Sequence, residues 1–250
     1  MEHIILPSTI SFVDTDRPHV GELTITPCRQ GYGTTLGNAL RRVLLSSLPG
    51  AAVESIRIND VQHEFSAIEG VQEDVIEIIL NTKQIAVKSF SDSPVVLHVS
   101  KKGVGTVTAG DFEKNADVEI INSDLVIANI TDKNKTFEMD IIVAKGRGYV
   151  PVHQKNTKDL DLGTIAIDSL YTPIRDVGYK VENTRVGDVT DYEKLILTIE
   201  TNGAIVPKDA VVQATRILMD HFALIMDMAG ADEGHESGVF DDEEAVEDAS

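Results

Sequence analysis

Cysteine is almost absent from this chain, since Cys28 is the only one among 250 residues. A single thiol cannot form an internal disulfide, and it cannot supply the several thiolates of a zinc or iron–sulfur site. The chain also lacks the run of about 20 apolar residues that a membrane-spanning helix needs. Its first residues, Met1 to Ile4, do not resemble a signal peptide. These absences predict a protein of the reducing cytoplasm.

Basic residues are scarce as well: 22 Lys and Arg stand against 41 Asp and Glu, for a net charge of −19. Binding to a phosphate backbone depends on clustered Lys and Arg, so this balance argues against direct DNA binding by this region. Residues 231–250 hold nine of the acidic residues and no Lys or Arg. We expect that segment to be a disordered acidic tail or a linker.

Sequence motifs of catalysis are missing too. There is no Gly-x-Ser-x-Gly elbow, no Gly-Lys-Ser or Gly-Lys-Thr string, and no second histidine at the spacing of a zinc hydrolase helix. We therefore expect no catalytic residue, no metal site and no cofactor. Cys28 is expected to be a small buried hydrophobic residue.

One glycine-rich turn, from Gly31 to Gly37, opens a helix and superficially resembles a dinucleotide-binding loop. Its spacing differs from that motif by one residue, and a preceding parallel strand and a following acidic residue are not evident. In the structural interpretation, Gly31 and Gly33 supply positive φ for the turn, and Gly37 lets another backbone approach the helix. The residues alone leave both interpretations open.

A helix is predicted from Leu36 to Leu48, with Thr34 or Thr35 as its cap and Pro49-Gly50 as its end. Its apolar residues recur at steps of three and four and form one stripe: Leu36, Ala39, Leu40, Val43 and Leu44. Arg42 lies nearly opposite this stripe, so its side chain should point away from the core.

The middle of the chain reads mainly as strands, with alternating apolar residues at 56–58, 95–99, 118–120, 137–143 and 165–167. A helix interrupts them, in which Ser66 and Glu69 are expected to form a capping box and Val71, Val75, Ile78 and Ile79 an apolar face. The expected fold class is therefore α+β.

A last strand at 195–199 precedes a long helix predicted from Pro207 to about Ala229. Its apolar seam includes Val211, Ala214, Leu218, Phe222, Ile225 and Met228. A seam of about 33 Å needs a long partner. That partner is either the chain's own sheet or a helix of a second copy.

Four strings together resemble the alpha subunit family of bacterial DNA-directed RNA polymerase: GYGTTLGNALRRVLLSSLPG at 31–50, HEFSAIEGVQEDV at 63–75, GRGYVP at 146–151 and ETNG at 200–203. The resemblance covers roughly Ile4 to Ala229. It implies a discontinuous helix-and-sheet dimerisation domain from residues 1–50 and 174–230, with a strand-rich α+β domain inserted at 51–173. Arg29-Gln30 departs from the Glu-Arg that the family commonly has there.

The same resemblance implies a non-catalytic scaffold that homodimerises and nucleates assembly of the β and β′ subunits, whose complex is a nucleotidyltransferase. It implies dimer contacts through Leu36, Leu40, Val43, Leu44, Val211, Leu218, Phe222 and Ile225. Contacts to β are implied for Arg42, Leu45, His63, Glu64, Glu69, Gly70 and Asp74. Contacts to β′ are implied for Lys83, Ile167 and Arg185. A nucleotide-binding enzyme and a dimeric adaptor unrelated to transcription are the rival hypotheses.

Overall fold

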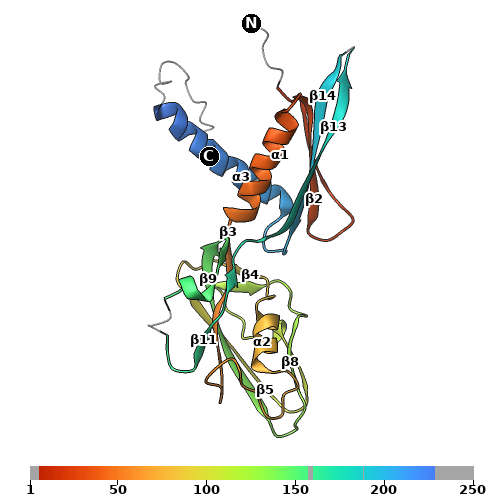
Figure 1. Cartoon of the computed structure of the whole chain (residues 1–250). Helices are drawn as coiled ribbons and strands as arrows, with labels where there is room; N and C mark the ends of the chain where they lie inside the picture. The colour runs from red at the N-terminus through yellow and green to blue at the C-terminus, as the bar shows by residue number, and fades with distance from the viewer. Residues whose placement is uncertain (1–5, 157–159, 188, 229–250) are drawn as a thin grey trace, which may run out of the picture.

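The computed structural model describes residues 6–156, 160–187 and 189–228, and the predicted acidic tail at 231–250 lies outside this range. Figure 1 shows an elongated molecule with two lobes. Each lobe has its own hydrophobic core: one is built from buried residues between 23 and 48 and between 174 and 214, the other from buried residues between 51 and 167. We call the first lobe the sheet–helix module and the second the insert.

The sheet–helix module contains a four-stranded antiparallel sheet in the order β1 (Thr9–Asp14), β2 (Val20–Arg29), β14 (Val189–Thr201) and β13 (Ile174–Val186). The helices α1 (Tyr32–Ser46) and α3 (Pro207–Met228) belong to the same module. Leu195, Leu197 and Ile199 alternate along β14 and are fully buried against the helices together with Leu44. This alternation places one apolar face of the sheet under the helices.

The insert is built on a six-stranded sheet in the order β5-β9-β3-β4-β7, with β11 paired to β3. These strands are β3 (Pro49–Ile58), β4 (Val87–Ser89), β5 (Val95–Lys102), β7 (Val118–Ile120), β9 (Thr136–Arg147) and β11 (Thr164–Ala166). The remaining elements are α2 (Val75–Thr82), the paired strands β6 (Gly105–Thr108) and β8 (Val126–Ile130), the paired strands β10 (Tyr149–Val150) and β12 (Ser169–Leu170), and two short 3-10 turns at Ala109–Asp111 and Val152–Gln154. Phe137, Met139 and Ile141 alternate into the core.

The predicted α+β class is confirmed, and every strand predicted above from alternation corresponds to a strand of the structure: β3, β5, β7, β9, β11 and β14. The long last helix is also confirmed, because α3 begins at the predicted Pro207. Apolar residues at a period of two or 3.6 predict these strands and helices correctly because each of them buries one face.

The helix of the insert was predicted with the wrong start. Ser66 and Glu69 do not cap it; Asp74 is the N-cap, and its carboxylate accepts the backbone N–H of Glu77 at 2.7 Å. Gly70 has a φ of 80°, which interrupts any helix before that point. Val71 instead forms an isolated β-bridge with Ile130. A capping box is present, as predicted, but it begins eight residues later in the chain, between Asp74 and Glu77.

The start of α1 also differs from the prediction. Gly31, with φ 87°, is the N-cap, and it is followed directly by helical Tyr32, so neither Thr34 nor Thr35 caps the helix. Because the cap residue is glycine, it has no side chain that could accept a hydrogen bond from the first turn. The free N–H groups of that turn therefore need another acceptor.

Candidate partner-binding surfaces

The acceptor at the start of α1 is Glu193 of β14. Its Oε1 accepts the N–H of Gly31 and its Oε2 accepts the N–H of Gly33, both at 2.9 Å. A nucleotide phosphate at a glycine-rich turn would use the same kind of N–H donors. Since an internal carboxylate already satisfies them, an incoming phosphate would meet its negative charge. The geometry therefore favours the structural interpretation of this turn over nucleotide binding.

The roles predicted for the individual glycines hold only in part. Gly31 has positive φ as expected, whereas Gly33 lies inside α1 without positive φ. A Cβ on Gly33 would lie 2.8 Å from the carboxylate of Glu193, and one on Gly37 would lie 2.7 Å from the ring of Tyr179. The close approach at Gly37 is thus to a side chain of the sheet rather than to another backbone.

Cys28 is 1% exposed, as predicted for a small core residue. Burial and the nearby negative charge of Glu193 raise the pKa of its thiol. A buried thiol with a raised pKa is a poor nucleophile, so no thiol chemistry is expected here.

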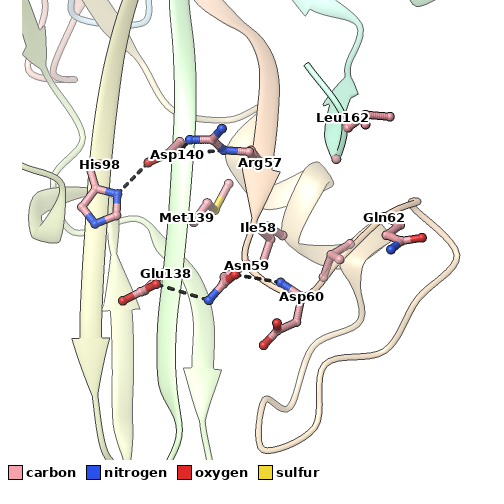
Figure 2. A pocket seen from close by; sticks show the side chains of 12 residues that line it. Arg57, Ile58, Asn59, Asp60, Gln62, His98, Glu138, Met139, Asp140 and Leu162 are labelled. Carbon is pink, nitrogen blue, oxygen red and sulfur yellow. Dashed lines mark hydrogen bonds and ion pairs between the residues drawn. The ribbon is translucent and has the colours of Figure 1, made fainter. Parts of the chain in front are cut away.

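A groove of about 920 Å³ lies on the insert and is lined by residues of β3, β5 and β9. Figure 2 shows His98 and Arg57 on either side of Asp140. His98 Nδ1 lies 2.6 Å from Asp140 Oδ1, and Arg57 Nε donates to Oδ2 at 3.0 Å. Burial raises the pKa of Asp140, but the hydrogen bonds from His98 and Arg57 outweigh this and hold it below its usual value.

Among the described residues this groove shows no catalytic constellation. No described serine, threonine or cysteine lines it, so none of them offers the His98–Asp140 pair a nucleophile to activate. In the part of the chain that the structure describes, no group of three or more His, Cys, Asp or Glu could hold a metal ion. No helix in that part is long and apolar enough to cross a membrane.

The residues predicted for a dimer interface divide into two groups. Leu40 and Leu44 are buried within the chain, and Leu36, Val43, Val211 and Leu218 pack partly against the same core. The apolar stripe of α1 is therefore covered mainly by the chain's own sheet. Phe222 and Ile225 differ, because 58% and 61% of their surface is exposed.

The exposed residues belong to the distal half of α3, residues 219–228, which are all exposed. Seven of these ten residues are apolar, and only Asp220, His221 and Asp227 are polar. In Figure 1 this half of the helix, coloured blue, extends past α1 and away from the sheet. A helical segment that is apolar on most sides is typical of a buried position, so this half is the candidate for an interface.

Residues predicted to contact β lie on both modules. Arg42 is exposed on α1, and its guanidinium has no bonding partner among the described residues, whereas Arg41 Nε donates to the carbonyl of Val177 at 2.8 Å. Leu45 is half-buried nearby. The insert carries the other members: His63, Glu64 and Glu69 are exposed, Gly70 forms a left-handed turn, and Asp74 caps α2.

Residues predicted to contact β′ are also divided. Lys83, at the end of α2, pairs with Asp168 at 2.9 Å, while Arg185 lies on β13 of the other module. Ile167 needs a correction, because its side chain is only 2% exposed and belongs to the core of the insert. It lies next to Asp168 in the chain, so it can shape this surface only through its backbone.

Sequence reasoning missed Glu193, Asp168 and Tyr171, each of which makes contacts far along the chain. Glu193 reaches α1, Asp168 pairs with Lys83, and the hydroxyl of Tyr171 donates to Glu54. None stands in a local motif, so no sequence signal distinguished them from other polar residues.

Comparison with known proteins gives consistent matches. The family model of the RNA polymerase Rpb3/RpoA insert domain matches residues 56–172. A protein of Symbiobacterium thermophilum named DNA-directed RNA polymerase subunit alpha is 51% identical over 208 residues, which is 83% of this chain and 66% of the relative. One of Clostridium kluyveri with the same name is 50% identical over 206 residues, 82% of this chain and 65% of the relative.

The chain thus spans slightly less than two thirds of the length of these curated relatives. The matched insert, the order of the four sequence strings and an identity of about half across both modules all point to one family. This chain belongs to the family of bacterial DNA-directed RNA polymerase alpha subunits and corresponds to their amino-terminal part.

Proposed function

We propose that this chain is a non-catalytic scaffold of DNA-directed RNA polymerase that homodimerises and then nucleates assembly of the β and β′ subunits in the cytoplasm. The observation that carries the proposal is the exposed apolar half of α3, residues 219–228. The nucleotidyl-transfer chemistry then belongs to the complex and to groups on other subunits. The chain itself takes no cofactor and makes no direct contact with DNA, in keeping with its net charge of −19.

Dimerisation is the first step because the distal half of α3 leaves apolar side chains exposed, and a second copy can bury them. The proximal half of the helix packs on the chain's own core through Ala210 and Ala214, which are fully buried. The distal half has no such cover from the described residues. In a twofold dimer the same patch meets its own copy, so each apolar side chain contributes twice.

Binding of the β and β′ subunits would use other exposed groups of the chain. Arg42 presents a guanidinium that can bind a carboxylate through two parallel hydrogen bonds, which lysine reproduces poorly. The paired Lys83 and Asp168 offer a charged surface on the insert. If one copy binds β and the other binds β′, each surface is used once in the assembly and the twofold symmetry is broken.

Light scattering coupled to size exclusion tests the first step, and a strictly monomeric chain at micromolar concentration contradicts the proposal. Replacement of Arg42 by Ala tests the second step. The variant should capture less β subunit in a pull-down while remaining dimeric. Arg17→Ala, an exposed arginine in the loop between β1 and β2, is the control and should capture β normally.

A further inference from the structure

The chain crosses between the two modules twice, and the two crossings touch. The outgoing crossing is Pro49-Gly50, at the start of β3, and the returning one runs from Tyr171 to Pro173, just before β13. A Cβ placed on Gly50 would lie 1.9 Å from the carbonyl oxygen of Tyr171. That distance is far inside van der Waals contact, so this approach of the two crossings requires glycine at position 50.

Tyr171 connects the returning crossing to several strands of the insert at once. Its ring packs on Gly146 of β9, where a Cβ would lie 2.7 Å from ring atoms. Its hydroxyl donates a hydrogen bond to the carboxylate of Glu54 on β3, and its backbone N–H donates to the carbonyl of Gly148 at 2.8 Å. A tyrosine hydroxyl is protonated at neutral pH and can donate, and burial and the bond to Glu54 raise its pKa further.

The modules also approach each other beside the crossings. Gly203, in the loop before α3, lies against the insert, because a Cβ there would be 2.8 Å from Ile121. Beside this contact lies a groove of about 800 Å³ lined by residues of both modules, among them Lys88, Pro173 and Val212. An open groove leaves space between two bodies, so we expect the crossings to contribute much of the constraint on the angle between the modules.

We propose that Tyr171, together with Gly50, Glu54 and Gly146, forms a joint that holds the two modules in one mutual orientation, and that Tyr171 is thereby a positioning residue for capture of a large partner. The second half rests on the proposed function, in which the β surface is divided between α1 and the insert. We expect a partner that contacts both modules to bind tightly only if the chain holds them in the bound orientation beforehand. Otherwise, ordering the two modules on binding costs free energy.

The test uses the full chain with spin labels on cysteines introduced at two exposed strand positions, Ser100 in the insert and Asp176 in the sheet–helix module. The native Cys28 is buried and should not react. Labelled chains are diluted with excess unlabelled chain, so that distances within one chain dominate. The variants are Tyr171→Phe, which removes the bond to Glu54, and Gly50→Ala, which cannot keep the present spacing. Gly105→Ala is the matched control, because a Cβ there meets nothing within 4 Å.

The parent chain and Gly105→Ala should show one narrow distance. Tyr171→Phe should broaden it and Gly50→Ala should shift it, and the affinity of both for purified β subunit should fall by about tenfold or more while they remain dimeric. Narrow, unshifted distances in both variants overturn the joint. Altered distances with unchanged affinity for β overturn the positioning role.

If the parent chain does not bind β at all, the proposed function fails, and the distances alone then decide on the joint. If circular dichroism shows that Gly50→Ala does not fold, the distances and the β affinity of Tyr171→Phe, which loses only one hydroxyl group, decide between these outcomes.

Discussion

Replacement of Phe222 by Ala should weaken the dimer without unfolding the chain. Complete burial of a phenylalanine side chain contributes about 1.5–3 kcal/mol. Since 58% of Phe222 is exposed in the single chain, about 1–2 kcal/mol remains to be gained in an interface. A twofold interface contains the residue twice, so the variant should lose about 2–4 kcal/mol of association free energy. At about 1.4 kcal/mol per tenfold, the dissociation constant should rise about 30-fold to 1,000-fold.

Sedimentation equilibrium over a concentration series measures this constant directly. Alanine is a strong helix former, so α3 should persist and circular dichroism should be unchanged. Leu80→Ala is a suitable control, because Leu80 is 54% exposed on a helix of the insert and should not affect association. A dissociation constant for Phe222→Ala equal to that of the parent chain would refute the reasoning, since it would mean that this face of α3 remains in solvent.

Three further predictions concern stability and partner choice. Glu193→Ala leaves the Gly31 and Gly33 N–H groups without their acceptor, so the free energy of unfolding in urea should fall by about 2 kcal/mol; a change below about 0.3 kcal/mol would contradict this role. The pKa of Asp140 is lowered in the folded state, so its stabilising contribution is present above the usual carboxyl pKa and is lost as the pH falls through the lowered value. Thermal melting from pH 7 to pH 3 should show that loss, and Asp140→Asn should show a smaller one. Ile167→Val should cost about 1 kcal/mol of stability yet leave β′ capture intact in a pull-down; a selective loss of β′ with normal melting would restore Ile167 as a contact residue.

The strand-rich insert shows how far local patterns reach. Alternation at 137–143 predicts β9 because this strand is buried on one face, with Phe137, Met139 and Ile141 in the core. The strand β13 escaped prediction, since its sequence IRDVGYKVENTRV mixes charged residues with a glycine. Its pairing with β14 along almost its whole length makes it a strand. Pairing between distant segments is a tertiary effect that β-propensity describes poorly.

The sequence alone determined the fold class, the long α3, the outward position of Arg42 and the family, because each depends on periodicity or on strings of neighbouring residues. The tertiary structure decided which apolar stripe is left uncovered: the stripe of α1 packs mainly on the chain's own sheet, whereas no described residue covers the distal half of α3. It also decided that Glu193 occupies the glycine turn and that Ile167 is buried. Burial and long-range hydrogen bonds depend on which segments meet in space, and no local spacing along the chain encodes that meeting.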